Sequence, residues 1–303
     1  MSVAAVVVSY NRKDLLRQCL ASLEIQGEAL DEIIVIENGS TDGSPDMVRK
    51  EFPSVTLSET GANLGGAGGF AWGIQTAIER GHTFGWLMDD DANPAPGSLA
   101  PLVEVALDRD LNAGFVAAQV TDEEGTAPNP GHPAVVDPDP QKQIRASAHG
   151  ALAVTQATFV GLLVNLEQAR TMPLPYADFF IWFDDAEYTR RLASRSIGVY
   201  VPGSVVRHPA KPANPDMAGR LFYYVRNHIW LSKLSEGQGV WEGNPAVKSL
   251  RVLAFALTIF AAARSKRTWA SALTRGVWEG LTRSPRAVMP GEYRPVGTSV
   301  APR

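Results

Sequence analysis

Three consecutive aspartates, Asp89, Asp90 and Asp91, are the residues of this sequence best suited to binding a metal ion. They follow residues 84–88, an apolar run with the composition of a short buried strand. Adjacent carboxylates repel one another, and a divalent cation with oxygen ligands is the usual compensation. A solvated acidic loop is the alternative, because runs of like charge are usually exposed. Two prolines and a glycine in residues 93–97 should end the strand, at the edge where open α/β sheets bind ligands.

A second acidic pair, Asp184 and Asp185, stands at the start of a predicted helix. One acid would be enough to cap that helix and to interact with its dipole, so a pair followed by Glu187 suggests a further role. The preceding Trp182 and Phe183 suit stacking on the face of a sugar, although packing in the core is an equal alternative.

Two weaker signals accompany the acids. Residues 63–70 place four glycines ahead of a predicted helix, where a backbone can approach phosphate oxygens closely, although a flexible turn explains them equally well. They match neither the Walker loop nor the dinucleotide fingerprint. His208 follows a predicted strand, where an imidazole would complete a metal site, although a lone histidine is more often structural.

The order of the elements predicts an α/β fold with a doubly wound, mostly parallel sheet. The predicted strands are 3–9, 33–36, 55–57 and 84–88, and the predicted helices between them are 13–25, 45–51 and 70–80. Farther on we expect a surface excursion over 121–148, a strand over 151–164, a helix over 184–194 and a strand over 197–201. The chain is predicted to be helical from Met217, which divides it into domains of 1–216 and 217–303.

Composition agrees with a globular protein of the cytosol. Of the 303 residues, 45% are hydrophobic and 20% are charged, and the single cysteine, Cys19, allows no disulfide framework. The amino terminus shows no signal-peptide pattern. Residues 247–303 hold ten Lys or Arg and two Glu, which gives this segment a net charge of +8. The net charge of the whole chain is −4, so residues 1–246 carry −12. A basic tail on an acidic body predicts contact with an anionic surface.

Taken together, the motifs resemble glycosyltransferase family 2, whose members have the Rossmann-like GT-A fold for nucleotide sugars. The matching pieces are residues 7–12 (Val-Val-Ser-Tyr-Asn-Arg), 36–44, 63–70, 89–91, 182–187 and His208, in the order of the family and over roughly residues 3–230. Within the family they look most like actinobacterial galactofuranosyltransferases of the cell wall, with rhamnosyltransferases of polysaccharide assembly close behind. One departure is Glu37, where many members have Asp.

The resemblance implies a mostly parallel sheet flanked by helices, with a helical C-terminal extension. It also implies inverting transfer of a sugar, galactofuranose from UDP-galactofuranose or else rhamnose from dTDP-rhamnose, to a hydroxyl of a polyprenyl-diphosphate-linked or glycan acceptor. No nucleic acid is expected among its partners.

The roles that the resemblance suggests fall into four groups. Asp89, Asp91 and His208 would hold Mn²⁺ or Mg²⁺, and Asp185, with Asp184 next to it, would act as the base for the acceptor hydroxyl. The nucleotide sugar would be bound by Ser9, Tyr10, Arg12, Glu37, Asn63, Gly65, Gly66 and Asp90, and the acceptor by Trp182, Phe183 and Glu187.

Two other classes of protein remain open. A nucleotidyltransferase also combines a parallel sheet with metal-binding acids, but it would normally carry a basic glycine-rich loop after the first strand, unlike residues 10–12. A module that only binds a sugar or a nucleotide would not require Asp185.

The basic tail contains residues 252–263, twelve positions without a charge. A spanning helix needs about 20 apolar residues, so this segment predicts either a helix buried against the domain or one lying in a membrane interface. Flanking arginines and lysines favour anionic lipids, and Trp269 and Trp278 suit the headgroup layer. We therefore predict peripheral docking of residues 245–286 on the cytoplasmic face of the cell membrane.

Overall fold

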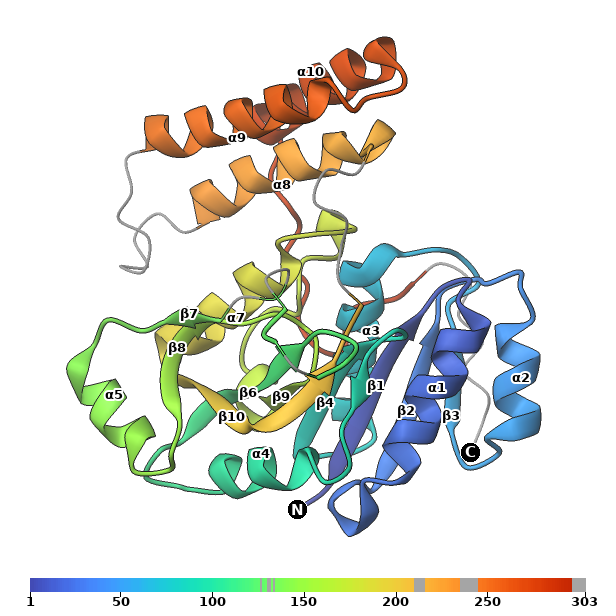
Figure 1. The fold of residues 1–303 in the computed structure, drawn as a ribbon, viewed down its shortest axis with the longest axis vertical. Helices are drawn as coiled ribbons and strands as arrows, with labels where there is room; N and C mark the ends of the chain where they lie inside the picture. The colour runs from blue at the N-terminus through green and yellow to red at the C-terminus, as the bar shows by residue number, and fades with distance from the viewer. Residues whose placement is uncertain (126, 130–131, 133, 210–215, 235–244, 296–303) are drawn as a thin grey trace.

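A computed structural model describes residues 1–125, 127–129, 132, 134–209, 216–234 and 245–295. Four parallel strands form the first half of its sheet in the order β3 (Thr56–Glu59), β2 (Glu32–Glu37), β1 (Val3–Ser9) and β4 (Phe84–Asp89). The chain first adds strands on one side of β1 and then places β4 on the other (Figure 1). Such a reversal is where open α/β sheets bind ligands, and it confirms the predicted parallel arrangement.

The second half of the sheet is mixed. Strand β9 (Leu162–Asn165) lies antiparallel between β4 and β6 (Ala113–Thr121), and β10 (Ile197–Arg207) runs parallel to β6. Strands β8 (Leu152–Gln156) and β7 (Val135–Val136) complete that side, and β5 (Asn93–Pro94) pairs with the end of β10. The carboxyl ends of β1, β2, β4, β6 and β10 therefore lie along one edge.

Two strand predictions were wrong in extent. Residues 151–164 form two strands, β8 and β9, because the chain turns at Gly161, whose φ of 70° suits glycine. Strand β10 continues beyond the predicted end at Val201 to Arg207, with a register shift between Val201 and Val205. Apolar composition shows that a segment is buried, but it does not show where the chain reverses.

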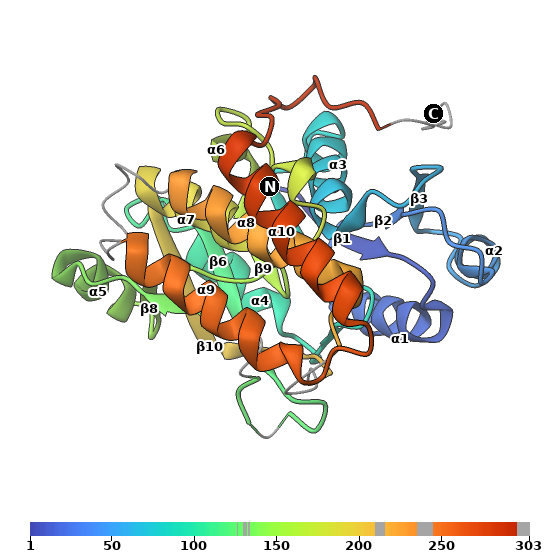
Figure 2. The ribbon, with the colours of Figure 1, turned by 90° about the horizontal axis from the view of Figure 1, so that it is seen from above.

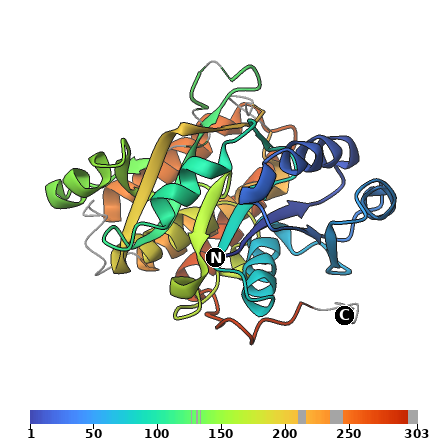
Figure 3. The ribbon, with the colours of Figure 1, turned by 90° about the horizontal axis from the view of Figure 1, so that it is seen from below.

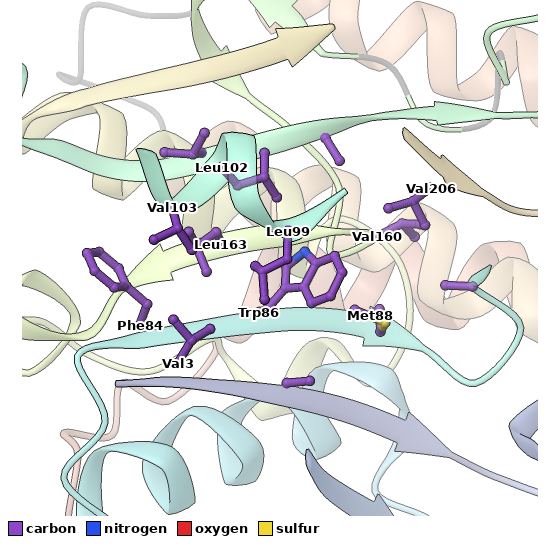
Figure 4. Close-up of a cluster of buried hydrophobic side chains, with 14 of the residues drawn as sticks. Val3, Phe84, Trp86, Met88, Leu99, Leu102, Val103, Val160, Leu163 and Val206 are labelled. Carbon is purple, nitrogen blue, oxygen red and sulfur yellow. The ribbon is translucent and has the colours of Figure 1, made fainter. Parts of the chain in front are cut away.

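Helices cover both faces of the sheet. Helices α1 (Lys13–Glu24), α2 (Ser44–Glu51) and α4 (Leu99–Ala106) lie on one face, and α3 (Gly65–Glu79), α6 (Leu166–Ala169) and α7 (Asp184–Arg195) lie on the other (Figure 3). The side chains of β1 alternate between the two cores, so this strand is buried throughout. Trp86 occupies the centre of one core, beside Leu99 of α4 (Figure 4).

The glycine-rich segment is part of a helix and not a loop ahead of one. Helix α3 begins at Gly65, and a Cβ placed on Gly69 or Gly73 would collide with the side chains of Val8 and Val6 of β1. The glycines therefore let this helix approach the sheet closely, which offsets their poor helix propensity.

The predicted excursion over 121–148 contains regular structure that the sequence analysis missed. Residues 135–136 form β7, and α5 (Pro140–Ser147) is capped by Asp139, whose side chain accepts a hydrogen bond from the backbone N–H of Gln141 at 2.9 Å. The helix has only eight residues and buries only Ala146, which leaves no clear apolar period to recognise.

Three C-terminal helices form a separate layer above the carboxyl edge of the strands (Figures 1 and 2). They are α8 (Leu221–Leu234), α9 (Pro245–Phe260) and α10 (Lys266–Thr282), and they confirm the predicted helical extension. Their own core contains Met217, Leu221, Val225, Val252, Ala256, Ile259 and Ala272. Gly276 and Gly280, one turn apart on α10, lie so close to α8 that a Cβ on Gly276 would come within 2.8 Å of the carbonyl oxygen of Phe222.

Residues 283–295 leave the helical layer and return to the sheet side of the molecule. They run past α3, where the side-chain oxygen of Gln75 accepts the backbone N–H groups of Gly291 and Tyr293 at 3.0 and 3.1 Å (Figure 2). The backbone N–H of Leu174 also donates to the carbonyl of Val288 at 2.9 Å. We call residues 283–295 the tail strap. The division at residue 216 remains a prediction, and the tail strap joins its two parts.

Within the described parts of the chain, none of the helices combines the length and the apolar character needed to cross a bilayer.

Candidate active site

The aspartate triplet and His208 meet at the carboxyl edge of the sheet. One ligand atom each from Asp89, Asp91 and His208 lies within 4.8 Å of the others. The two-residue strand β5 produces this proximity, because it follows the acids and pairs with the last two residues of β10, just before His208. The Nε2 atom of His208 lies 3.0 Å from a carboxylate oxygen of Asp91.

Positive groups balance the acids. The guanidinium of Arg12, in the loop after β1, contacts Asp91 and lies 3.3 Å from Asp90. Burial raises the pKa of Asp90 to about 6, although the backbone N–H of Tyr10 and the charge of Arg12 oppose the shift. Burial also acts to raise the pKa of Asp91, but His208 and Arg12 outweigh it and leave this pKa below its usual value. The same pairing holds the pKa of His208 above its ordinary value despite its burial.

The donor set fits a divalent metal ion. Two carboxylates and one imidazole at a strand edge offer oxygen and nitrogen ligands together. Carboxylates suit Mg²⁺ and Mn²⁺, and an imidazole is a common ligand of first-row transition metals. The structure thus brings together the three residues predicted to hold the metal.

The predicted nucleotide-binding residues lie along the same edge. Ser9 and Glu37 are register partners at the ends of β1 and β2. The carboxylate of Glu37 accepts the backbone N–H groups of Gly39 and Ser40 at 3.1 and 2.6 Å, and Asn63 accepts the N–H of Gly65 at 2.8 Å. Each of these two side chains therefore stabilises the loop to which it belongs. Their contact with a nucleotide remains a prediction.

The residues around that edge differ in how open their surroundings are to solvent or to a ligand. Tyr10 is exposed, and the position of Gly66 opens to free space. A side chain at Gly65, by contrast, would collide with the carbonyl group of Phe180. Gly65 thus serves the close packing of α3 against the segment before α7, while Gly66 leaves room for a ligand.

A strained turn places the second acidic pair. Phe180, Trp182 and Phe183 adopt φ angles of 63°, 67° and 69°, in the left-handed region. Each such conformation costs an L-residue about 1–2 kcal/mol, so the turn persists only because its surroundings enforce it. Helix α7 begins directly after it with Asp184 and Asp185.

The two acids at the start of α7 have different environments. Asp184 is buried, and this burial, together with the neighbouring charge of Asp185 and that of Asp89, raises its pKa well above the usual value. Asp185 is half-buried and accepts the backbone N–H of Ala186 at 2.6 Å. The contribution of Asp89 to this shift indicates that the two carboxyl groups are near enough to interact.

The residues predicted to bind the acceptor do not form one surface. The rings of Trp182 and Phe183 pack against Tyr224 of α8, with centroids 6.1 and 5.3 Å apart. Glu187 is only 4% exposed, and its two carboxylate oxygens accept hydrogen bonds of 2.8 Å from Arg191. Its prediction as an acceptor residue is therefore corrected, since the spacing of four along the helix turns it inward toward Arg191.

Several polar residues near the site escaped the sequence analysis. The ring of His132 lies 4.3 Å from that of His208, and the buried Arg190 donates to Gln156, with its pKa lowered to about 10 by burial. Arg226 and Asn227 of α8 contact the strained turn. His132 stands in a stretch rich in Pro and Gly, and the other three look like ordinary polar helix residues, so nothing in the sequence marks them.

The sequence matches the family model "Glycosyl transferase family 2" over residues 4–166, more than half of the chain. A galactofuranosyltransferase, GlfT1 of Mycolicibacterium smegmatis, is 38% identical over 93 residues, which cover 31% of each chain. This chain thus matches about a third of the length of that relative. An N-acetylglucosaminyl-diphospho-decaprenol L-rhamnosyltransferase of Mycobacterium tuberculosis is 25% identical over 269 residues, covering 77% of this chain and 84% of the relative.

Among solved structures, the fold is similar to that of the mannosyltransferase PcManGT of Pyrobaculum calidifontis, which was determined in complex with GDP-Man and Mn²⁺. The TM-score is 0.53 at 21% identity, and the match covers 91% of this chain and 75% of the other.

Proposed function

Because this chain belongs to glycosyltransferase family 2, we propose that it transfers a sugar, with inversion, from a nucleoside-diphosphate donor to a hydroxyl of an acceptor. One observation carries the proposal: the Asp89, Asp91 and His208 cluster gathers at the carboxyl edge of a GT-A sheet, and Asp89 is near enough to the second acidic pair to affect the pKa of Asp184. The first group suits a diphosphate leaving group and the second suits proton transfer.

The donor would lie over the ends of β1, β2 and β4. Ser9, Tyr10 and the loops shaped by Glu37 and Asn63 would hold the nucleoside, and Asp90 would contact the ribose or the sugar. Asp89, Asp91 and His208 would hold Mn²⁺ or Mg²⁺, which when bound offsets the charge that develops on the departing diphosphate. Arg12 adds a fixed positive charge beside the same oxygens.

The acceptor side depends on the contrast between Asp184 and Asp185. Burial keeps Asp184 protonated to a higher pH, so that it can donate a hydrogen bond to a sugar hydroxyl. The more accessible Asp185 would take the proton of the acceptor hydroxyl as that oxygen attacks the anomeric carbon. Two acids whose environments differ in this way can serve separately, one as a hydrogen-bond donor and the other as a proton acceptor. A single displacement needs no covalent nucleophile.

Galactofuranose from UDP-galactofuranose is the sugar we propose, and rhamnose from dTDP-rhamnose is the alternative. The galactofuranosyltransferase relative has the higher identity, whereas the rhamnosyltransferase relative covers more of the chain. The name of the latter includes a diphospho-decaprenol acceptor. For this chain we propose an acceptor of the same kind, a glycan carried on a polyprenyl diphosphate.

A donor panel tests the proposal. The full chain is incubated with Mn²⁺, UDP- or dTDP-sugars and polyprenyl-diphosphate-linked glycans, and the release of nucleoside diphosphate is measured. We expect release that requires both a matching donor and the lipid-linked acceptor. Tight nucleotide binding without turnover would favour a binding module, and pyrophosphate formation from a sugar phosphate and a nucleoside triphosphate would favour a nucleotidyltransferase.

We also propose that the helical layer docks on an anionic membrane. Large apolar side chains are exposed on its outer surface: Leu257 and Phe260 on α9, and Trp278 and Leu281 on α10. By helical position, Trp278 and Leu281 lie opposite Gly276 and Gly280, which face α8. Residues 264–267, where the connection from α9 enters α10, add three positive charges. These features together suit a bilayer interface.

One tryptophan predicted for the headgroup layer takes another role. The indole N–H of Trp269 donates to the carbonyl of Ala256 at 3.0 Å, and its ring packs against Phe260. Trp269 therefore holds α10 to α9, while Trp278 is 69% exposed and is the better candidate for lipid contact.

We predict that the protein sediments with phosphatidylglycerol vesicles and that the bound fraction falls as salt shortens the screening length to a few Å. The double variant Trp278→Glu, Leu281→Glu should bind at least about tenfold more weakly, because it removes two side chains each worth about 1.5–3 kcal/mol in an apolar phase. Leu107→Glu is the matched control, since Leu107 is also exposed but follows α4. Equal losses in both variants would contradict docking by the helical layer.

A further inference from the structure

A single amide on α8 supports the strained turn ahead of the acidic pair. The side-chain nitrogen of Asn227 donates to the carbonyl oxygens of Phe179 and Ile181 at 2.8 Å each, and lies 3.2 Å from that of Trp182. Asn227 is fully buried. Three carbonyl groups of one short segment thus converge on one donor group that comes from another part of the chain.

The neighbouring Arg226 fixes the orientation of this amide. Its Nε donates to the side-chain oxygen of Asn227 at 3.0 Å, so the amide nitrogen faces the carbonyls of the turn. A terminal nitrogen of Arg226 also contacts the carbonyls of Asp178 and Phe179. The guanidinium is in turn held over the ring of Trp230, 4.1 Å from its centroid.

Two other elements hold the same segment from different sides. The backbone N–H of Ala67 in α3 donates to the carbonyl of Phe180 at 3.2 Å. The backbone N–H of Arg286, in the tail strap, donates to the carboxylate of Asp178 at 2.7 Å. Neither of these bonds reaches the carbonyls of Ile181 and Trp182, which lie closest to the start of α7.

We propose that Asn227 is a positioning residue that fixes the backbone of residues 179–182 and thereby sets Asp184 and Asp185 in place. This inference rests on the proposed function, in which these acids serve the acceptor. The left-handed residues do not favour their conformation by themselves, so the turn depends on donors that compensate its buried carbonyls. Without Asn227 the turn relaxes, and the first turn of α7 moves with it.

The metal-binding cluster does not share this support. Asp89, Asp91 and His208 are placed by β4, β5 and β10, whose pairing involves neither α8 nor the strained turn. Loss of Asn227 should therefore leave donor binding intact and slow the transfer step. Displacement by about 1 Å is enough to cost about a hundredfold in rate.

The test compares Asn227→Ala with Val225→Ala. Val225 is the matched control because it is buried on the same helix and packs against Gly276 of α10, in the core of the three helices. Both variants should lower Tm. We expect only Asn227→Ala to lower kcat, by about 10- to 100-fold, with the Kd for nucleoside diphosphate and Mn²⁺ within about twofold of wild type. Hydrogen exchange of a peptide covering residues 178–188 should be faster only in this variant.

Asn227→Asp provides a second measurement if the alanine variant fails to fold. It keeps the shape and the contact with Arg226 but offers the turn acceptors in place of donors, so kcat should fall as in Asn227→Ala. A wild-type kcat in both Asn227 variants, or an equal loss in Val225→Ala, overturns the positioning role. If wild type releases no nucleoside diphosphate from any donor, the proposed function fails. Unchanged exchange over 178–188 in Asn227→Ala would then overturn the positioning role independently.

Discussion

Asp185→Asn should lower kcat by roughly 10²- to 10⁴-fold, the usual contribution of general base catalysis. The amide keeps the shape of the side chain but cannot accept the proton of the acceptor hydroxyl. The affinity for the donor should hardly change, because the metal-binding cluster and the nucleotide loops are placed by other elements. Steady-state transfer kinetics together with calorimetric titration of the nucleotide measure both quantities.

Glu187→Gln is the control for this experiment, since it also neutralises an acid in the first turn of α7. Glu187 forms a buried ion pair with Arg191, so its loss leaves an uncompensated buried charge, a defect that often costs 3–5 kcal/mol of stability. We expect a lower Tm with kcat near that of wild type. If Asp185→Asn instead weakens donor binding strongly and leaves kcat at saturating donor unchanged, Asp185 is a binding residue and the base lies elsewhere.

Asp91→Asn should abolish detectable transfer and Mn²⁺ binding together. Asp91 is only 7% exposed and contacts both His208 and Arg12, so the asparagine variant, which keeps the shape, is preferable to alanine. Loss of one charged ligand removes much of the several kcal/mol by which a metal ion stabilises a departing diphosphate. Treatment with EDTA should have the same effect on the wild-type protein and should be reversed by adding Mn²⁺.

The matched control for the metal prediction is Asp14→Asn, an exposed carboxylate on α1. It should change neither transfer nor the Mn²⁺ affinity measured by titration. Full activity of Asp91→Asn in the presence of EDTA would remove the metal ion from the mechanism.

The first half of the fold could be predicted from sequence because its signals are local. Strand β1 and the run ending at Asp89 are continuous apolar segments of a buried parallel sheet, and the acids stand directly after one of them. The helix start at Asp184 was also visible, since two acids follow a short aromatic segment. In these cases one stretch of residues contains both the element and the candidate functional residues.

The remaining features depend on pairing between distant segments. Strand β5 has two residues, one of them proline, yet its register with β10 carries His208 to Asp91. The glycines of α3 suggested a loop because glycine has a poor helix propensity. In the structure they are part of a helix, and they allow it to pack closely on β1. Asn227 meets carbonyl groups up to 48 positions away, a relation that no local pattern encodes.

The tail strap has a consequence for the order in which the protein is made. Tyr293 is 218 positions from Gln75, the residue on α3 to which it binds. At a synthesis rate of about 5–20 residues per second, it is translated roughly ten to forty seconds later. During that interval the sheet can already fold on the ribosome, while Asp178 and α3 still lack the tail strap. The strained turn and α3 therefore gain these contacts only after residues 283–295 have been synthesised, well after the strands of the sheet.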